Sequence, residues 1–176
     1  RQLNASEADA QLYGRLANSV IFVNPLLRAD ASVLIRNHRG QSGLWSSAIS
    51  GDLPIVLLQI KSAENIELVR QMVQAHAYWR LKGLAVDLVL WNGEHNGYRQ
   101  VLQEQIMHLI SAVGGGMGSQ GSERPGGIFL RTVDQISVED RVLFQAVARV
   151  VLSDGGGTLA EQINRREIME VRPPKL

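Results

Sequence analysis

Three short apolar runs alternate with three long amphipathic stretches, and this alternation constrains the fold more than any other feature of the chain. The runs cover residues 54–60, 85–91 and 127–131, and the amphipathic stretches cover residues 63–82, 97–113 and 138–152. Runs that are apolar on both faces are typical of strands in a parallel sheet that helices cover on both sides. The connections are long enough to bring successive strands parallel. We therefore predict a small three-layer α/β domain with a mostly parallel sheet of at least three strands and flanking helices.

Weaker patterns surround this central unit. Residues 6–22 have helical periodicity, and residues 32–36 are a candidate edge strand. We expect residues 1–172 to form a single domain excised from a longer chain, and residues 173–176 to be a linker to the next module.

The composition excludes several classes of function. Lys plus Arg number 18 and Asp plus Glu number 17, so the net charge of +1 gives no strong field for nucleic acid or anionic lipid. Cysteine is absent, which excludes disulfides, thiolate catalysis and Cys-ligated zinc. The four histidines have no metal-ligand spacing, and no apolar run is long enough for a membrane span. We expect no metal, no cofactor, no nucleic-acid partner and no direct membrane insertion.

The Gly-rich stretches do not match known phosphate-binding or nucleophile motifs. The loop 114–127 contains no Gly-Lys-Ser/Thr ending and follows a helix, and no G-x-G-x-x-G follows the first predicted strand. The string "GQSGL" has Leu44 where a nucleophile elbow needs glycine. We interpret these glycines as flexible or capping, and we assign no catalytic residue.

Polar side chains follow each predicted strand, at the edge where open parallel sheets bind ligands. They are Lys61 and Ser62 after the first strand, then Asn92, Glu94 and His95, then Arg131, Thr132 and Asp134. Cations, carboxylates and a general base could meet there. The alternative is that these loops are polar because they are wet, with Asn92 in a turn and Ser62 as a helix cap.

A second candidate is the polar loop "SGLWSSAISGD" before the first strand. An exposed Trp45 beside hydroxyls and a carboxylate could stack on the apolar face of a sugar. The alternative is that Trp45 plugs one end of the core. Six residues are therefore tentative substrate-binding candidates: Trp45, Ser47, Asp52, Asn92, His95 and Arg131.

Several longer strings resemble a segment of the bacterial cyclic β-1,2-glucan synthases. They are "RGQSGLWSSAISGDLPIVLLQI", "ENIELVRQMVQAHAYWRLKGLAVDLVLWN", "YRQVLQEQI", "RPGGIFLR", "DQISVEDRVLFQAVARVVLSD" and "GTLAEQINRR". That family consists of very large, membrane-embedded proteins that polymerise glucose from UDP-glucose and cyclise the glucan. Their carboxyl-terminal part resembles glycoside phosphorylases. No residue of this chain matches the family's catalytic carboxylates.

The resemblance implies a non-catalytic α/β module of a glycosyltransferase, serving in its architecture and in contact with glucan. Its partners would be neighbouring modules of the same chain and β-1,2-glucan. The segment itself would be soluble, on the cytoplasmic side of the inner membrane, within a membrane-embedded parent. Two alternatives stay open, namely a self-contained small α/β enzyme that uses the strand-end polar cluster, and a protein–protein scaffold.

Overall fold

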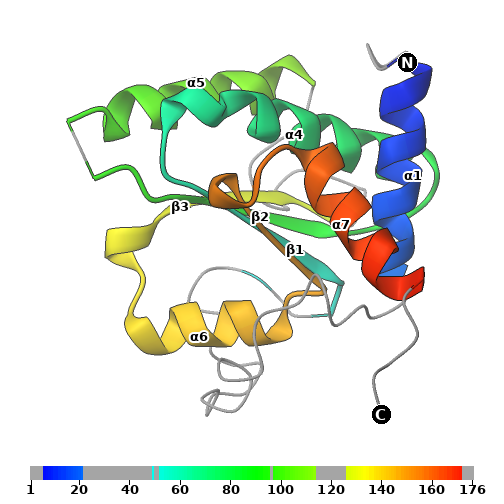
Figure 1. Ribbon diagram of the computed structural model, residues 1–176. Coiled ribbons are helices and arrows are strands. Elements are labelled where there is room, and N and C mark those ends of the chain that lie inside the picture. The colour runs from blue at the N-terminus through cyan, green and yellow to red at the C-terminus, as the bar shows by residue number, and fades with distance from the viewer. Residues whose placement is uncertain (1–5, 22–48, 50–51, 96, 114–125, 172–176) are drawn as a thin grey trace.

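The computed structural model describes residues 6–21, 49, 52–95, 97–113 and 126–171 (Figure 1). The elements follow in the order α1 (Glu7–Ile21), β1 (Ile55–Ile60), η2 (Ala63–Asn65), α4 (Ile66–Leu81), β2 (Asp87–Asn92), α5 (Arg99–Ala112), β3 (Ile128–Thr132), η3 (Val133–Gln135), α6 (Val138–Val147), β4 (Val150–Ser153), η4 (Asp154–Gly156) and α7 (Leu159–Val171), where η marks a 3-10 turn. The predicted α/β class is confirmed, because helices flank a parallel sheet. The candidate edge strand at residues 32–36 lies outside the described residues.

The sheet has four strands in the order β3-β2-β1-β4, and every pairing is parallel. The three predicted strands correspond to β1, β2 and β3. The chain moves outward from β1 to β2 and β3, and then returns to place β4 on the other side of β1. The direction of progress thus reverses at β1. In open α/β sheets, the crevice at such a reversal is where ligands bind.

The prediction of one helix over residues 138–152 is wrong at its carboxyl end. Helix α6 ends at Val147, and Ala148 is extended, with φ −63° and ψ 135°. The Arg149 N–H then donates to the Ile55 carbonyl at 2.8 Å, which starts the pairing of β4 with β1. Val150 and Val151 fit a helical stripe, but a short apolar run suits a buried strand equally well. Pairing with the open edge of β1 decides in favour of the strand.

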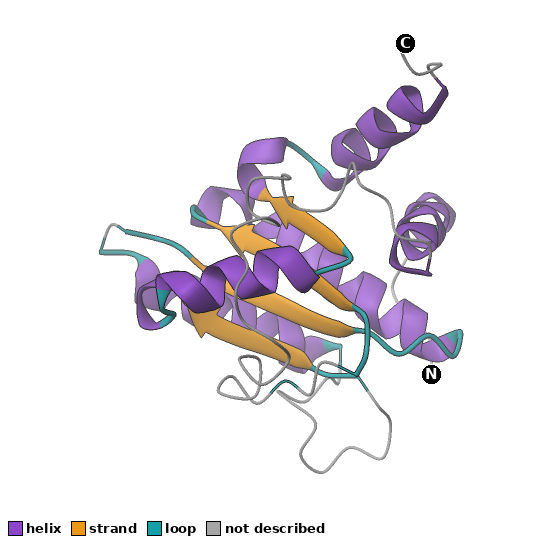
Figure 2. Ribbon diagram, turned by 90° about the horizontal axis from the view of Figure 1, so that it is seen from below, coloured by secondary structure: helices purple, strands orange, loops and turns teal. Residues whose placement is uncertain are grey.

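Helices cover the two faces of the sheet unequally. In Figure 1, α1, α4, α5 and α7 lie above the sheet, and α6 lies below it. Figure 2 shows α6 crossing the strands from the lower side. The two hydrophobic cores follow this division, since one combines the strands with α1, α4, α5 and α7, and the other combines them with α6.

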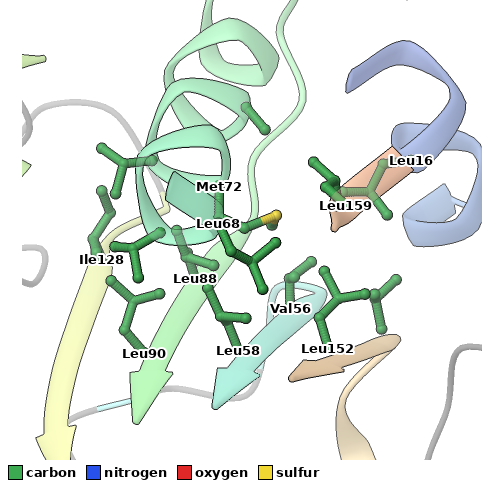
Figure 3. Close-up of a cluster of buried hydrophobic side chains, with 14 of the residues drawn as sticks. Leu16, Val56, Leu58, Leu68, Met72, Leu88, Leu90, Ile128, Leu152 and Leu159 are labelled. Carbon is green, nitrogen blue, oxygen red and sulfur yellow. The ribbon is translucent and has the colours of Figure 1, made fainter. Parts of the chain in front are cut away.

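The upper core is the larger of the two. Figure 3 shows Leu58 and Leu88 of the central strands facing Met72 of α4, with Leu16 and Leu159 meeting above β4. Successive side chains of a strand point to opposite faces of the sheet. The strand residues on either side of Leu58 and Leu88 therefore face α6. Each strand therefore contributes one row of side chains to each core.

Hydrogen bonds join α1, α4 and the entry to β2 inside the upper layer. The Trp79 indole Nε1 donates to the Tyr13 carbonyl at 2.9 Å, and the Tyr13 hydroxyl donates to Gln74 at 2.8 Å. His76 is buried, and its Nε2 lies 2.8 Å from the Val86 carbonyl. A carbonyl only accepts, so Nε2 carries the proton. His76 is therefore a core histidine whose Nε2–H has its acceptor.

Candidate functional site

The reversal point between β1 and β4 is filled by the carboxylate of Asp154. Its Oδ2 accepts from the Lys61 and Ser62 backbone N–H groups at 3.0 and 3.1 Å, and from the Asn65 side-chain amide at 3.0 Å. Ser62 in turn caps η2 by accepting from the Glu64 N–H at 3.2 Å. Backbone N–H groups at this position are the ones that bind anions in many α/β proteins. Here the chain's own carboxylate takes that place.

The Gly-rich turn after β4 is held by Gln162 of α7. The Gln162 amide donates to the Ser153 and Gly157 carbonyls at 3.0 and 2.9 Å. A Cβ at Gly156 would meet the Gln162 side chain at 2.9 Å, so glycine is needed for this close approach. Gly157 has φ +96°, which favours glycine as well. The turn is therefore packed against α7.

A capping box that sequence reasoning missed begins α7. The Thr158 Oγ1 accepts from the Glu161 N–H at 3.1 Å, and the Glu161 carboxylate accepts from the Thr158 N–H at 3.0 Å. These hydrogen bonds lower the pKa of the Glu161 carboxyl, with the backbone bond as the main cause. The spacing Thr-x-x-Glu is a known helix start, so the signal was present in the sequence.

Asn92 organises the connection from β2 to α5. Its side-chain amide donates to the Arg99 carbonyl at 3.1 Å and to Gln103 at 3.0 Å, and its Oδ1 accepts from the Glu94 N–H at 3.1 Å. Asn92 is fully buried. These three contacts use the donors and the acceptor of the amide, and they favour the structural alternative at this position.

Arg99 lies on the solvent side of the same connection from β2 to α5 and bonds to residues after β2 and after β3. It donates to the Glu94 carbonyl at 3.2 Å and forms an ion pair with Asp134, which follows β3. His95 lies between these groups in the chain and is exposed. The ends of β2 and β3 are thus joined by an exposed ion pair, a contact that contributes little stability on its own.

Arg131 lies on the other face of the sheet from Asn92. In the register of β2 and β3, Arg131 pairs with Trp91, and Asn92 pairs with Thr132. Because side chains alternate along a strand, Arg131 faces the α6 layer while Asn92 faces α5. The Arg131 guanidinium donates to the Leu130 carbonyl at 2.9 Å and lies 5.9 Å from the Phe129 ring centre.

The six candidate residues do not form one cluster. Trp45 and Ser47 lie outside the described residues. Asp52 is exposed and precedes β1, so it belongs to the opposite edge of the sheet from Asn92, His95 and Arg131. The two edges are separated by the length of a six-residue strand, about 20 Å. Asn92 and Arg131 share an edge but not a face. Their role in substrate binding stays a prediction.

Sequence reasoning also missed Asp154, which bonds the turn after β4 to the residues after β1, and Gln162, which holds that turn. The predicted helix over residues 138–152 left no strand before Asp154, and so did not bring Asp154 to the carboxyl edge of the sheet. Once β4 is known, the position of Asp154 directly after a strand is the signal. None of the helices that the structure describes has both the length and the apolar character needed to cross a bilayer. In the described ranges, no three His, Asp or Glu side chains gather as a metal ion would require.

The fold and these contacts define a small α/β module whose strand-end crevice is closed by its own side chains. No protein-family model matches the chain. The chain is 29% identical over 165 residues to the cyclic beta-(1,2)-glucan synthase NdvB of Rhizobium meliloti (strain 1021). The similarity covers 94% of this chain and 6% of that protein. The resemblance to the glucan synthases therefore extends along almost the whole chain, and it concerns a small part of a far longer relative.

Proposed function

We propose that the chain is a non-catalytic α/β module of a cyclic β-1,2-glucan synthase, where it supports the architecture and contacts the glucan. The observation that carries this proposal is the similarity to the NdvB synthase over 94% of the chain. A match of that extent, in a single alignment, is typical of a module with the same place in a larger protein. The parent would make cyclic glucan from UDP-glucose, as part of a membrane-embedded assembly with this module on the cytoplasmic side.

The contacts at the carboxyl edge support a non-catalytic role. Asp154 is hydrogen-bonded to two backbone amides and one side-chain amide, and Asn92 uses its amide on three neighbours. A catalytic acid or base must instead reach a substrate atom within hydrogen-bond distance. These polar groups stabilise the turns after the strands, because their hydrogen bonds are made to neighbouring residues of the same chain.

A protein–protein scaffold is the second candidate, and exposed apolar side chains favour it. Tyr98 and Val101, one helical turn apart at the start of α5, are 64% and 46% exposed. Neighbouring apolar side chains on a surface are typical of sites that contact other proteins. Neighbouring modules of the same long chain are the partners that the first proposal already implies.

Two assays on the isolated chain separate these functions. The first incubates it with UDP-glucose, and with β-1,2-glucan plus inorganic phosphate, and follows release of UDP or of glucose 1-phosphate. The second titrates it with linear β-1,2-linked gluco-oligosaccharides by calorimetry. We expect binding without turnover. Turnover in the first assay would overturn the non-catalytic role, and failure to bind glucan would leave the scaffold as the better function.

A further inference from the structure

Strand β3 is an edge of the sheet, and its backbone groups point alternately toward β2 and away from it. The order β3-β2-β1-β4 places β2 on one side of β3 and, in the part of the chain that the structure describes, no strand on the other. The Leu88 N–H donates to the Gly127 carbonyl at 2.9 Å, so Gly127 and every second residue after it bond to β2. The N–H and C=O groups of Ile128, Leu130 and Thr132 therefore point outward. Such an edge is a template for pairing with another strand.

The Arg131 side chain lies along this edge and covers what the strand would offer to a partner. Its guanidinium donates to the Leu130 carbonyl at 2.9 Å, and Leu130 is the middle residue of the strand. The same guanidinium lies 5.9 Å from the centre of the Phe129 ring. A cation on an edge strand is one of the devices by which folded proteins prevent such edges from pairing. Arg131 therefore occupies the central outward acceptor of β3.

A second copy of this chain is the partner that the edge fits best, because the edge is complementary to itself. A two-fold axis beside Leu130 brings Leu130 opposite the same residue of the copy, and Ile128 opposite Thr132. All of these residues have outward backbone groups, so each position becomes a hydrogen-bonded pair of an antiparallel ladder. Such pairing would continue the sheet from one copy into the other.

We propose that the outer edge of β3 is a pairing surface for a second copy of this chain, and that Arg131 prevents that pairing. The central antiparallel pair needs the Leu130 carbonyl of each copy as an acceptor. The Arg131 guanidinium competes for that carbonyl in both copies, and two guanidinium groups at one interface also repel each other. This inference is independent of the proposed function.

The test removes the guanidinium and compares three further variants. Arg131→Ala exposes the Leu130 carbonyl, whereas Arg131→Lys keeps a cation that can donate to it. Arg141→Ala is the matched control, since the Arg141 Nε donates to the Ile136 carbonyl at 3.0 Å, a bond of the same kind made from α6. The last variant combines Arg131→Ala with Thr132→Pro, which removes an outward N–H at a residue whose φ of −89° is close to that of proline.

Each variant is first checked for a native thermal melt, and its mass is then measured by analytical ultracentrifugation over a range of concentrations. We expect the parent, Arg131→Lys and Arg141→Ala to be monomers. We expect the mass of Arg131→Ala to roughly double as its concentration rises, because it forms a two-fold dimer. The outward Leu130 N–H should exchange with deuterium more slowly in that dimer than in the parent. The added Thr132→Pro change should restore the monomer.

The other outcomes would overturn the proposal. If Arg131→Ala stays monomeric at every concentration, or if the parent already pairs through β3, Arg131 does not prevent pairing. Association that persists with Thr132→Pro, or that leaves the Leu130 N–H unprotected, would come from another surface or from partial unfolding. In either case β3 is not the pairing surface.

Discussion

Trp79 and Trp91 are both buried tryptophans, and a single hydrogen bond distinguishes their environments. The Trp79 N–H donates to the Tyr13 carbonyl and so joins α4 to α1, whereas the Trp91 N–H has no acceptor among the described residues. The cost of removing a buried donor depends on whether it has a partner. The two sites therefore offer a direct comparison at the level of one N–H group.

We expect Trp79→Phe to lower the free energy of unfolding by about 1 to 2 kcal/mol more than Trp91→Phe does. Both changes remove the same volume from a core, so their packing losses are similar, and the hydrogen bond makes the difference. Urea unfolding of the two variants and the parent measures it. Equal losses would show that the Trp91 N–H is satisfied in solution.

His76 should make stability depend on pH. Burial is the main cause that lowers its pKa from 6.5 to about 4, opposed by the hydrogen bond to Val86 and aided by the charge of Arg80. Between these values the unfolded chain binds more protons than the folded one, so stability rises with pH. Stability is fully present above pH 6.5, and about 3 kcal/mol is lost as the pH falls from 6.5 to 4.

The His76→Gln variant should remove this dependence, because glutamine can donate to the same carbonyl without titrating. The measurement is urea unfolding of both proteins at several values between pH 7 and pH 4.5. Asp87, whose pKa is raised by burial, contributes a slope of opposite sign, but it is present in both proteins and cancels in the comparison. Parallel stability curves for the two proteins would contradict the assignment to His76.

At the scale of elements, Asp154 connects β4 to the start of η2. Asp154→Ala would leave two backbone N–H groups and the Asn65 amide without their acceptor. We expect a loss of about 2 kcal/mol in unfolding free energy. Asp134→Ala is the control, because it breaks only an exposed ion pair and should cost less than about 0.5 kcal/mol. Chemical denaturation compares them, and similar losses in the two variants would refute the role of Asp154 as the acceptor that joins β4 to the start of η2.

Gly126 sets the entry to β3. It has φ +92°, and a Cβ there would meet the Val86 carbonyl oxygen at 2.8 Å and the Val86 nitrogen at 3.0 Å. Backbone atoms cannot yield as side chains do, so Gly126→Ala should lower the melting temperature, with a loss of about 2 kcal/mol or more. At Gly97 a Cβ meets nothing within 4 Å, so Gly97→Ala is the control. A thermal melt of Gly126→Ala that matches the control would show that the entry to β3 adapts.

The boundary between α6 and β4 shows where local patterns stop being informative. Residues 138–152 carry a continuous helical stripe, and their sequence contains no glycine or proline to end it. The helix ends at Val147 because the next residues complete the hydrogen bonding of β1. That information belongs to a strand nearly a hundred positions earlier. By contrast, α4 and α5 were predictable, because the helical periodicity of their apolar residues stops where turn residues follow.

At the scale of the whole molecule, the parallel architecture could be predicted from the sequence, but the strand order could not. Alternation of strands and helices determines that the strands are parallel. It does not determine the side of β1 on which a later strand pairs, and β4 itself was not predicted. The prediction of the candidate site also failed at this scale. Residues after successive strands were expected to meet, yet Asn92 and Arg131 face different layers, since each strand turns alternate side chains to opposite faces.

The late position of β4 has a consequence for synthesis of the protein. β1 lies at the centre of the finished sheet, but Asp154 and its partner Lys61 are 93 residues apart in the chain. Ribosomes add about 5 to 20 residues per second, so one edge of β1 stays unpaired for roughly 5 to 20 s after β1 emerges. An apolar strand with an open edge can pair with other chains during that interval. A nascent chain would therefore depend most on a chaperone between the emergence of β1 and that of β4.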